Sequence, residues 1–247
     1  MITNNRSRVR EALLFSAVFL ALALSSCATS GRYVLLKEYG ASVPSRDPRP
    51  LEGVTICIKG FDTAPQLNGT PPEGKDPLVP RSFSYLPMTD AQTQKWSDEA
   101  DKAKDSAPKS DLREIGNLRN GYGMVLSHIW ALNDPGAWLA DTLRKDWESL
   151  GATVVDPANA NQADIVVGGK IQLCKVDMYM GIWSDFVVDL ALQPKGGEEA
   201  VSTIYTKGTV DLTWVGSNED FFTSIRQSRQ KFSWLATDKL LAALGKQ

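Results

Sequence analysis

The sequence has few of the residues that most catalytic and metal sites require. Its 247 residues include one histidine, His128, and three cysteines. A serine triad needs a base, an orienting acid and a strained turn around the serine, and no G-x-S-x-G sequence is present. A zinc site needs three or four suitably spaced ligands, which one histidine and distant cysteines do not supply. Neither a P-loop nor a complete dinucleotide-binding fingerprint occurs, so the sequence predicts no catalytic residues, no metal site and no cofactor.

An excess of positive charge is also lacking. The chain has 27 Lys and Arg residues against 29 Asp and Glu residues, and its formal net charge is −2. A nucleic-acid-binding surface usually carries a basic patch or stripe, so we expect no nucleic-acid partner. Acidic residues are numerous, but a catalytic carboxylate pair is recognised by its geometry rather than by its sequence. A carboxylate-dependent hydrolase therefore stays open as an alternative, and it requires two acidic side chains that converge in a cleft.

The sequence has no apolar run long enough to span a membrane, and its longest one lies near the N-terminus. Residues 12–24 (ALLFSAVFLALAL) carry no charge and follow Arg6, Arg8 and Arg10. The run is shorter than the roughly 20 residues of a membrane-spanning helix. It has the length and the basic flank of a secretory signal sequence, and small residues follow it as a cleavage site requires. We therefore predict that residues 1–26 are a signal peptide that is removed.

A cysteine stands at the end of this segment. Leu24, Ser25, Ser26 and Cys27 resemble the lipobox of bacterial lipoproteins. The resemblance implies that the chain is cut before Cys27, and that this cysteine is acylated on its thiol and on its new amino group. Several acyl chains hold a protein stably at a membrane, so the membrane is a partner through Cys27. The alternative is an ordinary secretory signal in which the cysteine stands by chance.

The residue after Cys27 bears on the location of the protein. Ala28 stands where an aspartate usually retains such lipoproteins in the inner membrane. For a Gram-negative source, the resemblance therefore implies a lipid-anchored protein of the outer membrane that faces the periplasm. Residues 27–52 are then expected to be a linker between the lipid and the folded domain.

The two remaining cysteines lie in predicted strands. Cys57 and Cys174 each alternate with apolar neighbours, so both thiols are expected on the more polar face of a sheet. The periplasm is oxidising, and a cysteine pair there tends to form a disulfide. A bridge requires neighbouring strands and Cα atoms within about 7 Å. A Cys57–Cys174 disulfide and two free thiols therefore both stay open.

We expect residues 53–247 to fold as a single domain with a proline-rich insertion at about 62–108. Seven of the thirteen prolines lie in this insertion. Its polar second half either forms an exposed helix that begins at Thr89 or Asp90, or is disordered, because it has little apolar surface to bury. We expect the insertion to have no core of its own.

The rest of the domain alternates between helical and extended patterns. Asp134 and Pro135 predict the start of a helix, and Gly151 predicts its end. Several strands with alternating apolar residues follow, and Ser217 predicts the start of a final helix. One apolar face per strand and one apolar stripe per helix predict an α+β two-layer sandwich, with a mostly antiparallel sheet and two helices on one face.

The outer face of this sheet is expected to be polar with aromatic side chains on it. These aromatic residues are Phe61, Tyr179, Trp183 and Tyr205. They either pack against one another or form a platform for a ligand, and the sequence does not identify a small-molecule ligand.

The stretch IGNLRNGYGM is similar to a run found in the YajG-type family of bacterial lipoproteins. The matching residues are Ile115, Gly116, Arg119, Asn120, Gly121, Gly123 and Met124. The similarity extends over residues 54–244 and departs at the proline-rich insertion. It implies a small envelope lipoprotein without catalytic residues, and it makes residues 115–124 a candidate loop for contact with a partner.

These observations together predict a non-enzymatic, lipid-anchored binding or assembly module of the cell envelope, with an envelope protein as its partner. One alternative is an auxiliary lipoprotein subunit of an ABC-type lipid transport system, which requires an apolar groove between the helices and the sheet. The other alternative is the carboxylate-dependent hydrolase.

Overall fold

The computed structural model describes residues 31–44, 49–81, 83–120, 122–211 and 216–246. The predicted signal peptide, Cys27 and Gly121 lie outside the described residues. The chain from Arg32 onward forms one compact unit. None of the helices in the described ranges is long and apolar enough to cross a bilayer.

The unit consists of an eight-stranded sheet and helices that connect its strands. In chain order the elements are β1 (Arg32–Val34), β2 (Thr55–Thr63), α2 (Asp90–Ser106), β3 (Arg113–Arg119), β4 (Val125–Ala131), α3 (Pro135–Ser149), β5 (Thr153–Val155), the 3-10 helix η1 (Pro157–Gln162), β6 (Ile165–Met178), β7 (Ile182–Pro194), β8 (Ala200–Val210) and α4 (Asn218–Ala243).

The sheet is mixed, and the expectation of a mostly antiparallel sheet is wrong. Strand β6 lies at its centre: one edge pairs in parallel with β2 near the start of β6 and with β3 near its end. The other edge of β6 pairs antiparallel with β7, which pairs antiparallel with β8. Four of the seven strand pairs are parallel. Alternation of apolar residues indicates which face of a strand is buried, but it does not indicate the direction of the neighbouring strand.

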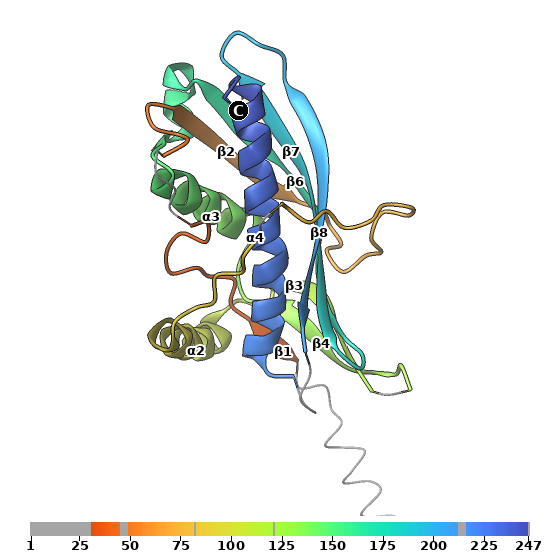
Figure 1. Cartoon of the computed structure of the whole chain (residues 1–247). Helices are drawn as coiled ribbons and strands as arrows, with labels where there is room; N and C mark the ends of the chain where they lie inside the picture. The colour runs from red at the N-terminus through yellow and green to blue at the C-terminus, as the bar shows by residue number, and fades with distance from the viewer. Residues whose placement is uncertain (1–30, 45–48, 82, 121, 212–215, 247) are drawn as a thin grey trace, which may run out of the picture. The chain divides into compact units, whose positions relative to one another are not determined.

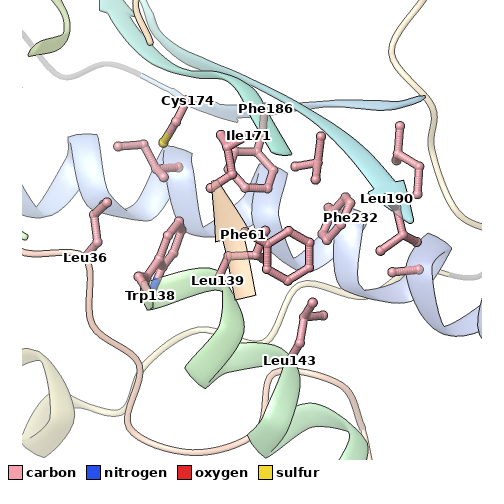
Figure 2. Packing of buried hydrophobic residues seen from close by; sticks show 14 of the residues in the cluster. Leu36, Phe61, Trp138, Leu139, Leu143, Ile171, Cys174, Phe186, Leu190 and Phe232 are labelled. Carbon is pink, nitrogen blue, oxygen red and sulfur yellow. The ribbon is translucent and has the colours of Figure 1, made fainter. Parts of the chain in front are cut away.

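Helices cover one face of this sheet, as predicted, but there are three of them in the described ranges rather than two (Figure 1). The Asp134 side chain accepts a hydrogen bond from the Ala137 N–H at 2.7 Å and starts α3. Ser217 caps α4 in the same way. Helix α4 lies very close to β8, because a side chain at Gly208 would meet the Ser224 carbonyl oxygen at 2.0 Å. Side chains from α3, α4 and the strands fill the space between the layers (Figure 2).

The proline-rich insertion wraps around the sheet. After β2 it reaches the outer edge of β8, where the Leu78 N–H donates to the Tyr205 carbonyl at 2.7 Å (Figure 1). It then continues to the helical side, where the Leu86 N–H donates to Oε1 of Gln230 on α4 at 3.0 Å. The insertion is therefore bound to both layers of the domain.

The second half of the insertion is helix α2, and it contributes to the core. The Thr89 side chain caps α2, which confirms the helical alternative. Trp96 is 3 % exposed and stacks on Phe222 of α4, with ring centroids 5.1 Å apart. Its indole N–H donates to the Leu35 carbonyl at 2.7 Å. Among its described residues the insertion has no separate core, and it is attached to the core of the domain by Leu67, Trp96 and Ala100.

Residues 32–44 and 49–52 belong to the folded unit and are not a linker. Strand β1 pairs in parallel with β4, and Arg32 lies opposite Ile129. Val34 and Leu51 are fully buried. The sequence of this segment is rich in Pro, Arg and Asp, which is typical of a linker. Its apolar side chains are buried by residues that are distant in the sequence, so local composition did not predict their burial.

A β-bulge places Cys174 in the core rather than on the polar face. The register of β6 against β7 shifts between Ile171 and Leu173. Before the shift Ile171 faces the core, and after it Cys174 does, as Figure 2 shows. Leu173 lies in a separate small cluster with Val187 and Tyr205. A second register shift, between Ile58 and Gly60 on β2, accompanies Phe61 facing the core instead of the outer face.

The structure has two free, buried thiols at Cys57 and Cys174. Cys57 lies opposite Val166, and Cys174 follows Val166 by eight residues along β6. At about 3.3 Å per residue, the two cysteines are roughly 26 Å apart along the strand direction. This separation excludes the Cys57–Cys174 disulfide, which needs Cα atoms within about 7 Å.

Candidate functional site

The turns of two hairpins lie at the same end of the sheet. Strand β3 runs toward its turn beside the end of β6, with Leu118 opposite Met178. The β3–β4 turn and the β6–β7 turn therefore lie at one end of the domain, in the lower right of Figure 1. The Asn120 side chain organises the first turn, because its Oδ1 accepts hydrogen bonds from the N–H groups of Tyr122 and Met124, both at 3.0 Å.

Large apolar side chains are concentrated at these two turns. Of the nine large hydrophobic side chains that are exposed among the described residues, six lie there. We call them the hairpin-end surface: Tyr122, Met124, Val125, Leu126, Tyr179 and Met180. Contiguous exposed apolar patches mark sites of interaction with proteins or membranes, whereas scattered apolar residues need no such explanation.

Met180 is held in a conformation that is unusual for its type. Its φ angle is 55°, the only positive value at a non-glycine residue in the described ranges, and its side chain is 83 % exposed. Glycine or asparagine adopts this left-handed conformation at lower cost. Because the side chain is in solvent, packing within the fold does not account for a methionine at this position.

A small cleft of about 240 Å³ lies between the two hairpins. It is lined by Arg119, Gly123, Asp177, Tyr179 and Trp183. The Arg119 Nε lies 3.4 Å from Oδ1 of the nearly buried Asp177, so the cation is balanced within the cleft. The arrangement provides aromatic walls, one ion pair and an apolar rim, which suits binding rather than bond making or breaking.

The candidate loop at residues 115–124 is only partly a loop. Ile115 and Gly116 lie inside β3 and are buried. A side chain at Gly116 would meet the Val176 carbonyl oxygen at 1.5 Å, so this glycine serves strand packing. Arg119 lines the cleft, and Met124 lies on the hairpin-end surface. The sequence motif thus combines structural residues with surface residues.

The sequence motif did not include the second hairpin. The sequence pattern predicts that residues 179–180 end a long strand, and only the parallel pairing of β3 with β6 brings them beside the first hairpin. Tyr179 and Trp183 were considered as aromatic residues of the outer face, and both line the cleft. No feature of the sequence indicates that Met180 is exposed or that it lies beside the first hairpin.

A second cleft, of about 610 Å³, lies beside the start of α3. Its lining includes two acidic residues, Asp62 and Glu199, and the cation Lys59. Both acidic residues are exposed. The general acid of a carboxylate pair is usually enclosed by apolar side chains, so this cleft supplies acidic residues without the surroundings that hydrolysis requires.

The strongest electrostatic feature is a buried ion network on α4. Arg229 is fully buried and donates through Nη2 to Oε1 of Glu38 at 2.5 Å and through Nη1 to Oδ2 of Asp146 at 3.1 Å. Arg226 donates through Nε to Oε2 of Glu38 at 2.7 Å, and Ser42 donates through its backbone N–H and its hydroxyl to Asp146. Each carboxylate is occupied by an arginine, so the network holds elements together rather than exchanging protons with a substrate.

Other titratable residues show how closed the interior is. Burial raises the pKa of the Cys174 thiol to about 12, so it is protonated and unreactive at neutral pH. Burial also raises the pKa of Tyr205, whose hydroxyl donates to Asp185 at 2.7 Å. His128 is half exposed and lies 3.0 Å from Oε1 of Glu114. In the part of the chain that the structure describes, no cluster of three or more His, Cys, Asp or Glu residues could hold a metal ion.

Comparison with known proteins yields distant structural likenesses. No family model matches the sequence, and no curated protein matches it. The crystal structure of a Xanthomonas campestris protein described under the family model DUF330 is similar with a TM-score of 0.47 at 9 % identity, covering 85 % of this chain and 95 % of that chain. The crystal structure of an uncharacterized protein is similar with a TM-score of 0.47 at 7 % identity, covering 86 % of this chain and 99 % of that chain. Scores and identities this low do not indicate the family or the function of this chain, so the resemblance to the YajG-type family stays a prediction.

Proposed function

We propose that this protein is a non-enzymatic, lipid-anchored binding module of the bacterial envelope, which faces the periplasm and makes contact through the hairpin-end surface. The observation that carries the proposal is the concentration of six of nine exposed large hydrophobic side chains on two adjoining turns. Exposed apolar side chains lower the solubility of a protein, and burying them against a partner removes this unfavourable contact with water.

The location in this proposal rests on the sequence. The basic N-terminus, the short apolar run and the cysteine at position 27 support a lipoprotein signal. Ala28 supports an outer-membrane position for a Gram-negative source. Three acyl chains on Cys27 would hold the domain within reach of envelope components.

The two alternative functions have less support. Lipid transport would use an apolar groove between helices and sheet, and side chains such as Phe186 and Phe232 fill this space (Figure 2). The two clefts described above both have charged residues in their walls. Hydrolysis would use Asp62 and Glu199, whose exposure leaves them solvated. If purified mature protein cleaved a cell-wall or ester substrate, the non-enzymatic proposal would be refuted.

The experiment that tests the proposal is photo-crosslinking in intact cells. A benzophenone amino acid replaces Leu126 on the hairpin-end surface, or Val201, which is also exposed and apolar but lies at the opposite end of the sheet. We expect an identified envelope component to be captured from position 126 and not from position 201. Mass spectrometry of the N-terminal peptide is expected to find Cys27 acylated. Equal capture from both positions, or an N-terminus without lipid, would contradict the proposal.

A further inference from the structure

We propose that the hairpin-end surface docks on the lipid bilayer itself, so that the two turns enter the interfacial region and orient the domain on the membrane that carries its anchor. This inference deepens the proposed function and rests on the lipidation of Cys27.

The first argument is the position at which the described chain begins. Strand β1 runs parallel to β4, and Arg32 lies opposite Ile129. The start of β1 therefore points toward the end of the sheet at which β4 begins with Val125. Val125 precedes Ile129 by four residues, which corresponds to about 13 Å along the strand.

The second argument is the length of chain between the anchor and the fold. Cys27 precedes Arg32 by five residues. Five extended residues span at most about 17 Å, which is only slightly more than the distance from the level of Arg32 to the hairpin turn. An anchor on Cys27 therefore keeps the hairpin end of the sheet near the bilayer surface and leaves little room for a protein between them.

The third argument is the composition of the two turns. Residues 122–126 and 178–182 contain no charged side chain. Tyr122, Tyr179 and Trp183 supply the aromatic residues that favour the boundary between headgroups and acyl chains. Arg119 in the cleft and Lys175 on β6 both pair with Asp177, so the cations near the turns lie beside a carboxylate.

The fourth argument concerns the main chain of the turns. A segment that enters the membrane interface loses part of its hydration, so hydrogen bonds within the turn lower the free energy needed to bury its backbone N–H groups. The N–H groups of Tyr122 and Met124 donate to the Asn120 side chain, and that of Gly123 donates to the Asn120 carbonyl. In the second turn the Tyr179 N–H donates to the Gly181 carbonyl at 3.0 Å. These four hydrogen bonds reduce the number of N–H groups that the turns would carry into the membrane interface without a partner.

The test measures the depth of single positions in the full-length lipidated protein. The protein is reconstituted in vesicles of phosphatidylethanolamine and phosphatidylglycerol that contain a doxyl-labelled phospholipid. A polarity-sensitive fluorophore is attached at Leu126→Cys, or at Val201→Cys as the matched exposed position at the far end of the sheet. The buried thiols of Cys57 and Cys174 stay unlabelled, and protein without an added cysteine gives the background.

We expect a blue shift and strong quenching of the fluorophore at position 126, and neither effect at position 201. The variant Met180→Asn keeps a residue suited to the left-handed conformation and removes the apolar side chain, so it is expected to fold normally and to reduce the quenching at position 126. Unfolding midpoints of both proteins check that the loss does not reflect misfolding.

Each outcome separates this inference from the proposed function. Acylated Cys27 with no quenching at position 126 overturns bilayer docking; if the crosslinker at that position then captures an identified envelope protein, the surface binds that protein and the proposed function holds. A chain without acyl groups on Cys27 refutes the proposed function and removes the basis of the inference with it. Equal quenching at positions 126 and 201 also overturns the inference, because the domain would then have no fixed orientation.

Discussion

Replacement of Arg229 tests whether the buried ion network holds the helices to the N-terminal segment. The variant Arg229→Met keeps most of the side-chain volume and removes the cation. Asp146, which is fully buried, would keep only its hydrogen bonds from Ser42, while Glu38 would keep Arg226. Removing one partner from a buried ion pair costs about 3–5 kcal/mol, because the remaining charge is left uncompensated in the interior.

This loss is large compared with the stability of a typical domain, which is about 5–15 kcal/mol. We expect urea unfolding of Arg229→Met to move to a much lower midpoint at an unchanged slope. Tryptophan fluorescence is a suitable readout, because the Trp138 ring lies 6.0 Å from the guanidinium of Arg229 and Trp147 is fully buried.

A double variant separates the burial of charge from other effects. Asp146→Leu combined with Arg229→Met removes both charges, so it is expected to cost less than the sum of the two single variants. The control is Lys37→Met, which breaks the ion pair between Lys37 and Glu99; because the Lys37 side chain is 46 % exposed, we expect a loss below about 1 kcal/mol. A loss of about 1 kcal/mol or less in Arg229→Met would refute the assignment of a dry, stabilising network.

Three further predictions address the thiols, a close strand contact and the anchor. Cys57 and Cys174 are expected to resist a thiol reagent at pH 9 in the folded protein and to react once it is unfolded, because burial raises both pKa values, that of Cys174 to about 12. A disulfide found by mass spectrometry under non-reducing conditions would contradict the structure. Gly116→Ala should lower the free energy of unfolding by at least the roughly 1–3 kcal/mol of an overpacked core, since its side chain would meet a β6 carbonyl oxygen at 1.5 Å. Gly181→Ala places its side chain in open space and should change the stability little. Similar unfolding midpoints for the two variants would argue against the pairing of β3 with β6. Cys27→Ser should move the protein from the membrane fraction to the soluble fraction, and unchanged fractionation would show that no lipid on this residue anchors it.

The local sequence determined the elements whose signals lie within a few residues. The cap formed by Asp134 and Pro135 placed α3, and Ser217 placed the start of α4, because capping depends on side chains that bond to nearby N–H groups. The alternation of apolar residues along β7 places Phe186 and Leu190 on the same face of the strand, and this face lies against the core. The short apolar run and the lipobox-like residues before Cys27 predict a lipoprotein signal, and the mass of the mature N-terminus tests this prediction.

Tertiary structure decided the features that depend on distant neighbours. Glu38 and Arg229 are separated by 191 residues, and in the sequence each reads as an ordinary surface charge. The change in apolar phase after Leu173 predicts a bulge near Cys174, but the pairing with β7 is needed to place the shift between Ile171 and Leu173, which turns Cys174 into the core. Local periodicity does not state which strands pair or in which direction, so the parallel pairs of the sheet were not predictable from it.

The candidate site shows the same division. The sequence identified the first hairpin through its Asn- and Gly-rich motif, and it supplied the exposed Met124. It did not indicate that the turn with Met180 lies beside this hairpin, because that proximity arises from the pairing of Leu118 with Met178 in the sheet. The sequence by itself thus predicted a lipid anchor and a candidate contact loop. Only the tertiary structure gathered the apolar residues of the two turns at one end of the sheet, since parallel strand pairing brings together segments that no local interaction connects.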